Sequence, residues 1–142
     1  MKNIYKFAAF LIVCLCSFQS ATAQMSASFH TNAHYSKIGL GYNFNERLWL
    51  DGRIYSGTTI EGITPEVSLN YNFIQREIYE TYFGAGVVLN HLNAVVLQSG
   101  LQLKPIENLR NFSFILEAQP QYNWDYETFY FNAFGGIRYK FN

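Results

Sequence analysis

Thiols are missing from most of this chain. The two cysteines, Cys14 and Cys16, both lie near its start, and no cysteine follows them. If that start is removed, the rest of the chain cannot form a disulfide, a thiolate metal site or a cysteine nucleophile. Such a chain is compatible with an oxidising compartment such as the periplasm.

Charge is scarce as well. Lysine and arginine number 10, aspartate and glutamate number 10, and charged residues make up 14% of the sequence. Soluble domains usually carry about a quarter of charged residues. The balanced charge offers no basic footprint, so we expect no nucleic-acid partner. Aromatic residues reach 18%, which is unusual for a surface that faces only water.

The chain has one continuous apolar run, and it is short. A basic start at Met1–Lys6 precedes an apolar stretch at Phe7–Phe18, followed by the small-x-small pattern Ala21-Thr22-Ala23. This is the layout of a secretory signal, and a membrane-spanning helix would need about 20 apolar residues. The sequence therefore predicts a signal peptide at 1–23, cleaved between Ala23 and Gln24, and a single mature domain at 24–142.

The remaining sequence alternates between apolar and polar residues. From Ile63 to Phe73 the odd positions are apolar or aromatic, apart from Pro65, and the even positions are Thr, Glu, Ser or Asn. A period of two is typical of a strand with two different faces. The same pattern predicts strands at 34–44, 48–56, 63–74, 78–90, 94–104, 112–122 and 129–141. Most of them have the roughly 9–11 residues that a tilted transmembrane strand needs.

Exported single-chain barrels have an even number of strands, and both termini lie on the periplasmic side. We therefore expect an eighth strand upstream, within Met25–Asn32, although its alternation is poor. The predicted fold is all-β: a closed antiparallel up-and-down transmembrane β-barrel with eight strands. The turns near 45–47, 75–77 and 105–111 would then be periplasmic.

One face of the predicted strands carries no charge. Lysine or arginine on a lipid-facing wall costs about 2–4 kcal/mol at mid-membrane, so this face is predicted to contact lipid. Aromatic residues gather on this face at the periplasmic strand ends, as in a membrane-interface girdle: Tyr42, Phe44, Tyr71, Phe73, Phe112, Tyr139 and Phe141. The alternative is a soluble, lipocalin-like barrel with these rings inside, but its rings would have no reason to gather at one end.

The other face is polar and is predicted to fill the lumen. Its charged residues form a candidate lumen charge network: Lys37, Asp51, Arg53, Glu66, Glu80, Lys104, Glu117, Arg138 and Lys140. An eight-stranded barrel is only wide enough to hold side chains, so a balanced filling predicts a plug rather than a channel.

Folding the hairpins sharpens this prediction. It places Gly39 and Gly41 opposite Arg53 and Asp51, and it leaves room for those long side chains. It also places Arg53 opposite Glu66, and Glu80 opposite Lys104. Because a buried charge needs a partner, removing Glu66 is expected to leave the Arg53 guanidinium unpaired.

With signal, alternation and girdle assembled, the chain resembles the small eight-stranded bacterial outer-membrane barrels, of the type of outer membrane protein X and the membrane domain of outer membrane protein A. The most specific match is Gly135-Gly136-Ile137-Arg138-Tyr139-Lys140-Phe141, which resembles the C-terminal strand recognised by the barrel-assembly machinery. The chain departs from that pattern by ending on Asn142. The resemblance implies an outer-membrane location, with outer-membrane lipid and the assembly machinery as partners. A shared fold does not transmit function.

Three functions stay open at this point. The first is a non-enzymatic structural barrel, with no cofactor and no metal. The second is an accessory subunit that other outer-membrane proteins recognise sideways. The third is a lipid-A-modifying enzyme that uses His30, His34 or His91 with Glu66 near the outer rim. No His-x-Ser or Gly-x-Ser-x-Gly pattern marks a nucleophile, so we expect no enzyme activity.

Overall fold

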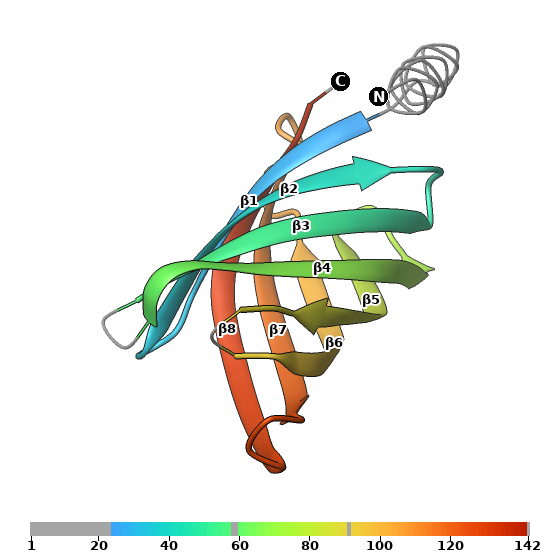
Figure 1. Ribbon diagram of the computed structural model, residues 1–142. Helices are drawn as coiled ribbons and strands as arrows, with labels where there is room; N and C mark the ends of the chain where they lie inside the picture. Colours follow the sequence, from blue (N-terminus) through green and yellow to red (C-terminus); the bar gives the residue numbers. More distant parts are fainter. Residues whose placement is uncertain (1–23, 58–59, 91, 142) are drawn as a thin grey trace, which may run out of the picture.

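The computed structural model describes residues 24–57, 60–90 and 92–141. The predicted signal peptide at 1–23, and with it Ala23, lies outside these ranges. Eight strands pair in chain order to form a closed barrel (Figure 1). Their bounds are β1 (Gln24–Thr31), β2 (Tyr35–Asn43), β3 (Leu48–Gly57), β4 (Ile60–Gln75), β5 (Tyr79–Val88), β6 (Ala94–Leu103), β7 (Phe112–Asn123) and β8 (Thr128–Lys140).

The predicted fold class is confirmed. Each strand pairs antiparallel with its neighbours, and β1 pairs with both β2 and β8, which closes the barrel. The eighth strand expected within Met25–Asn32 is β1, which begins at Gln24. Within the described ranges, no helix is long and apolar enough to cross a membrane.

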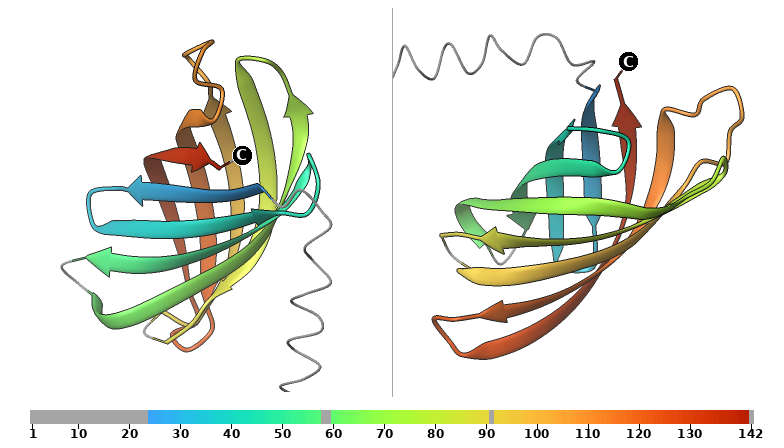
Figure 2. Two further views of the ribbon diagram at one scale, coloured as in Figure 1. Left: turned by 90° about the horizontal axis from the view of Figure 1, so that it is seen from above. Right: turned by 90° about the vertical axis from the view of Figure 1, so that its right-hand side faces the viewer.

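The barrel has two different ends. The start of β1 and the end of β8 lie together at one end, which we call the proximal end (Figure 2). The connections after β2, β4 and β6 also lie there. The connections after β1, β3, β5 and β7 form the opposite, distal end. The long connection between β6 and β7 is proximal, so the distal end holds little chain outside the barrel.

The register of the first hairpins agrees with the sequence prediction. Gly39 pairs with Arg53 and Gly41 with Asp51, and Arg53 in turn pairs with Glu66. The expected pairing of Glu80 with Lys104 is wrong. Glu80 lies opposite Gln102, because Val88 pairs with Ala94 and the reversal is centred one residue earlier than expected. Two residues of this turn, Asn90 and Asn93, have positive φ values of 75° and 27°.

Side chains fill the barrel as its polar and aromatic core. Among the largest fully buried side chains are Trp49, Arg53, Arg138, Tyr82 and Lys37. The outward positions of the same strands are apolar and exposed, for example Ile38, Leu40, Leu69 and Leu116. The molecule is therefore inverted relative to a soluble domain, because charges lie inside and apolar side chains lie on the surface.

One glycine makes room for an aromatic ring in the lumen. Gly100 on β6 pairs with Tyr82 on β5. A methyl group at Gly100 would overlap the Tyr82 ring, and that ring is fully buried and cannot swing away. Gly135 on β8 gives a matched contrast, because a methyl group there would meet nothing within 4 Å.

We therefore expect Gly100→Ala to lower the free energy of unfolding by about 1–3 kcal/mol, the usual cost of overpacking. Gly135→Ala should be neutral or slightly stabilising, because alanine restricts the unfolded chain. Urea unfolding of the refolded protein, followed by tryptophan fluorescence, measures both variants. Equal effects at the two positions would contradict the packing of Tyr82 over Gly100.

Candidate functional site

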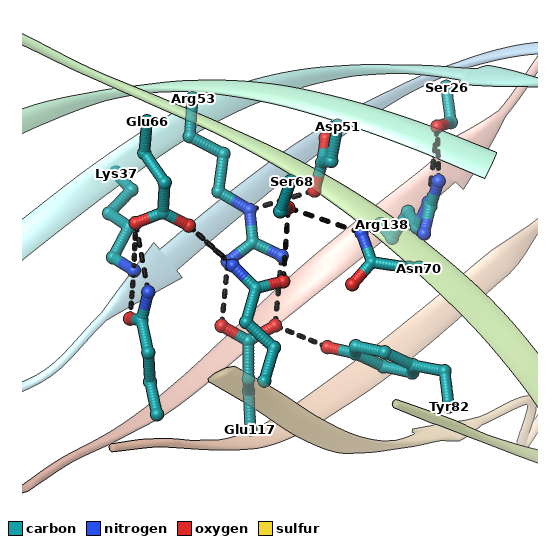
Figure 3. Close-up of polar contacts among 12 residues, drawn as sticks. Ser26, Lys37, Asp51, Arg53, Glu66, Ser68, Asn70, Tyr82, Glu117 and Arg138 are labelled. Atoms are coloured by element: carbon teal, nitrogen blue, oxygen red, sulfur yellow. Dashed lines mark hydrogen bonds and ion pairs between the residues drawn. The ribbon is translucent and has the colours of Figure 1, made fainter. Parts of the chain in front are cut away.

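Arg53 lies at the centre of the lumen and binds three carboxylates (Figure 3). Its Nη1 and Nη2 atoms donate to the two oxygens of Glu117 over 2.6 and 2.8 Å. Its Nε atom donates to Asp51 over 2.7 Å, and Nη1 also lies 3.3 Å from Glu66. Because these carboxylates come from β3, β4 and β7, the guanidinium joins strands on different sides of the barrel. Bidentate pairs of this kind are the strongest that arginine forms.

Glu66 faces Arg53, but Lys37 is its main cation. The Lys37 Nζ atom lies 3.0 Å from one Glu66 oxygen. Two amides complete the site, since Gln98 and Gln119 donate to Glu66 over 2.6 and 3.0 Å. Lys37 also donates to the Gln119 carbonyl oxygen. Every oxygen of this buried carboxylate is thus bound, as burial of a charge requires.

The expectation for Glu66 therefore needs correction. The Arg53–Glu66 pair exists, but loss of Glu66 would leave Arg53 bound to Glu117 and Asp51. It is Lys37 that would lose its carboxylate partner. The sequence prediction placed Glu117 in the lumen but did not pair it with Arg53, because β3 and β7 are not neighbours and ladder pairing says nothing about contacts across a lumen.

Arg138 is stabilised mainly by an aromatic ring and a hydroxyl group, and not by a carboxylate. Its guanidinium stacks on the Trp49 ring at 3.6 Å and donates to the Ser26 hydroxyl over 2.8 and 3.1 Å. Trp49 in turn packs edge-on against Tyr82, whose hydroxyl donates to Glu117. A cation over an aromatic face is stabilised without an ion pair. This layer connects the proximal part of the lumen to the central network.

The proximal mouth carries a second ion cluster. Lys104 and Lys140 each bind one oxygen of Glu80, and the Lys140 contact measures 3.2 Å. Lys104 reaches Glu80 even though the two residues are not paired across the ladder. These lysines are partly exposed, in contrast to the central residues. Together with Glu46 and Arg110 they line an open polar recess of about 390 Å³.

The distal part of the lumen is closed by apolar side chains. Tyr55, Val88, Ala94, Val96 and Phe134 form one buried cluster. The Lys37 ammonium lies over the rings of Phe134 and Tyr55, at 3.9 and 4.5 Å from their centres. The charged layer is therefore covered on its distal side by rings and aliphatic groups. The residues of the candidate lumen charge network lie in the lumen or at its proximal mouth, and each except Arg138 forms an ion pair there with another described residue.

The candidate histidines lie in different surroundings. His30 is fully buried in the lumen, and its ring nitrogens have no hydrogen-bond partner among the described residues. His34 lies in the distal turn after β1, and His91 falls outside the described residues. Glu66 is engaged by Lys37 and Arg53. In the part of the chain that the structure describes, no cluster of His, Cys, Asp or Glu could hold a metal ion.

The wall carries aromatic residues at both ends. The predicted girdle lies at proximal strand ends and points outward, with Phe44, Tyr71, Phe73, Tyr139 and Phe141 exposed and Tyr42 and Phe112 half-buried. A second group is exposed on the distal β7–β8 hairpin: Tyr122, Trp124, Tyr126, Phe129, Tyr130 and Phe131. Tyr130 has the same parity as the buried Phe134, yet it is 42% exposed, because β1 ends before it and leaves this part of β8 uncovered. The sequence Trp124-Asp125-Tyr126 in the last hairpin could have indicated this second aromatic group.

We expect Glu117→Ala to lower the free energy of unfolding by about 3–5 kcal/mol, because it leaves the buried Arg53 without its bidentate partner. The matched control is Glu77→Ala, which removes an exposed partner of Arg110 at 3.8 Å. That change should cost about 0–1 kcal/mol. Urea unfolding in lipid vesicles compares them. A cost for Glu117→Ala no larger than that of the control would contradict the central role of Arg53.

No protein-family model matches the chain. No curated protein matches it either. Among solved structures, a protein from work on the de novo design of transmembrane β-barrels superposes with a TM-score of 0.60 at 18% identity, over 87% of this chain and 98% of that one. The outer membrane protein Ail of Yersinia pestis, determined in a phospholipid bilayer nanodisc, matches with a TM-score of 0.47 at 15% identity, over 84% of this chain and 98% of that one. The likeness to the designed protein shows the fold, an all-β closed antiparallel barrel of the transmembrane kind.

Proposed function

We propose that the chain is a non-enzymatic integral protein of the bacterial outer membrane, with a structural role in the envelope and a closed lumen. Its mature part would begin at Gln24 after signal cleavage. We further propose that it is of the same type as outer membrane protein X and the membrane domain of outer membrane protein A. Outer-membrane lipid and, during insertion, the barrel-assembly machinery would be its partners.

The inverted distribution of polarity carries this proposal. Arg53, Glu66 and Glu117 are buried in the lumen, while the outward faces of the same strands are apolar and exposed. In water such a surface would drive aggregation, whereas in a bilayer it is the favourable arrangement. A closed barrel also leaves the spanning backbone hydrogen-bonded, as hydrocarbon requires.

The closed lumen argues for a structural role rather than transport. The central ion pairs bridge β2, β3, β4 and β7 and occupy the cross-section. The apolar cluster around Phe134 covers them on the distal side. With the proximal girdle at the periplasmic interface, the distal end would face the outside of the cell.

The first test is localisation. Cell fractionation should place the protein in the outer membrane, and its mobility on a gel should change when the sample is boiled, because folded barrels of this kind resist unfolding in detergent. Purification in mild detergent should give a single band. Recovery as a soluble periplasmic protein without detergent would overturn the proposal and favour a lipocalin-like barrel.

The second test is conductance. Pure protein in a planar bilayer should pass little ion current, because the lumen is filled by side chains with balanced charge. Stable, large steps of current that do not depend on voltage would contradict the closed lumen. The same preparation must show the heat-dependent mobility change, so that a silent record comes from folded protein.

An accessory subunit of a larger outer-membrane assembly is the second candidate. A shallow groove of about 500 Å³ crosses the wall, lined by residues that include Ser99, Ala118 and Ala133. These small residues are direct neighbours across β6, β7 and β8. Small residues allow close approach between proteins within a membrane. A stoichiometric companion in the mild-detergent purification would favour this candidate over the stand-alone barrel.

A further inference from the structure

β8 extends well past its neighbour at the distal end. The pairing of β1 with β8 stops at Thr31 and Gly135, whereas β8 itself begins at Thr128. Among the described residues, no strand pairs with 128–134 on the side of β1. Figure 1 shows the β7–β8 hairpin continuing beyond the end of β1. We call this stretch, Thr128–Phe134, the β8 edge.

The alternation of hydrogen bonds along β8 shows which of its backbone groups face this edge. The Phe141 amide donates to the carbonyl of Met25 in β1, and the Lys140 amide donates to the carbonyl of Asn111, which directly precedes β7. Successive residues of a strand direct their amide and carbonyl to opposite sides. Phe129, Phe131 and Ala133 therefore present both groups to the open side. Their side chains belong to the outward face, and Phe129 and Phe131 are each 65% exposed.

The β8 edge has none of the features that usually keep an edge strand from pairing. Its sequence, Thr-Phe-Tyr-Phe-Asn-Ala-Phe, contains no charge, no proline and no glycine. Natural sheets protect their edges with charged residues or proline, with bulges or with a covering segment. At the distal end β4 also extends past its neighbour β5, but there the chain after β5 covers part of the β4 edge. There Leu89 donates to the Pro65 carbonyl over 2.9 Å, and the Asn90 side chain donates to the Ile63 carbonyl over 2.5 Å.

We propose that the β8 edge is a docking site at which an extended segment of a partner protein adds as a strand, antiparallel to β8 and in line with β1. Free amides and carbonyls that alternate along a strand match an extended main chain, and strand addition of this kind is a common mode of peptide recognition. Acyl chains offer no hydrogen-bonding groups to the edge. Unpaired amides are also costly near hydrocarbon, so a partner strand stabilises this part of the rim.

A second copy of the chain does not suit this site. Two barrels in one membrane share the same orientation, so their β8 strands run in the same sense across the bilayer. Strands of a barrel also tilt by about 35–45°. A two-fold axis along the membrane normal would therefore cross two β8 strands at a wide angle, and a ladder could not form between them. The occupant is accordingly a segment of another protein.

Charge defines one end of that segment. The distal connections, at 32–34, 58–59, 89–93 and 124–127, contain no lysine or arginine. The connection that precedes the β8 edge contains Asp125 and Glu127, and both are exposed. The C-terminal end of an antiparallel strand would lie beside them. A partner segment with uncharged alternating residues and a basic residue at its C-terminal end fits this surface.

The test uses the folded barrel in detergent and a fluorescent peptide of about seven residues, in which threonine and valine alternate before a C-terminal lysine. Phe131→Pro removes one free amide without touching the β7–β8 ladder, because proline is tolerated at an edge. Phe131→Thr is the matched control, since it removes the ring and keeps the amide. We expect Phe131→Pro to weaken binding about tenfold or more and Phe131→Thr to change it by about threefold or less.

The peptide supplies independent controls. N-methylation of the amides that face β8 should abolish binding, whereas N-methylation on the other side should not. Exchange of the terminal lysine for glutamate should weaken binding, and Asp125→Asn with Glu127→Gln should remove that difference. If Phe131→Pro does not fold, the methylated peptides decide alone.

Three outcomes would overturn the proposal. Equal losses for both Phe131 variants would show adhesion to an aromatic ring and not strand addition. Binding that is insensitive to methylation would place the peptide elsewhere. No binding to the wild-type barrel at about 1 mM peptide would refute the site. The heat-dependent mobility change, measured on every sample, reports the fold separately, so a failure of the membrane proposal is not confused with a failure at the β8 edge.

Discussion

The central part of the lumen is built around the need to pair the buried guanidinium of Arg53. A charge taken out of water is tolerated only with partners in good geometry. Glu117, Asp51 and Glu66 supply these partners from three strands. Glu66 in turn needs Lys37, Gln98 and Gln119, and Glu117 also accepts from Tyr82. Gly39, which faces Arg53 across the ladder, leaves the space in which the long side chain can turn. The packing of the central part of the lumen follows from these contacts.

The wall and the lumen satisfy different groups: the wall pairs the backbone, and the lumen pairs the charged side chains. Closure of the ladder satisfies the backbone, so the outward side chains are free to be apolar throughout. The interior then holds the charged side chains, which the outward face cannot accommodate. Ion pairs occupy the centre, a cation stacked on Trp49 lies toward the proximal end, and the cluster around Phe134 closes the distal end. Because the pairs join strands that are not neighbours, they brace the barrel across its width.

Alternation alone predicted seven of the strands, because one face is wet and the other apolar in almost every segment. β1 was found by the requirement for an even strand number, since its own pattern from Gln24 to Thr31 is weak. What alternation could not supply was anything that depends on three dimensions. The Glu80 pairing was wrong because the turn between β5 and β6 is centred one residue earlier than the sequence pattern suggested. The contact of Arg53 with Glu117 crosses the lumen, and the exposure of Tyr130 depends on where β1 ends.

The polarity of the lumen is graded along its axis. Partly exposed lysines line the proximal mouth, buried ion pairs follow, and a layer of rings and aliphatic side chains lies at the distal end. Among the described residues, a polar recess opens the interior to solvent at the proximal mouth. In heavy water, deuterium would advance through the lumen as a front that starts beside Glu80 and reaches the Lys37 ammonium last. The two ends of the lumen should therefore differ in how fast their side chains exchange with solvent.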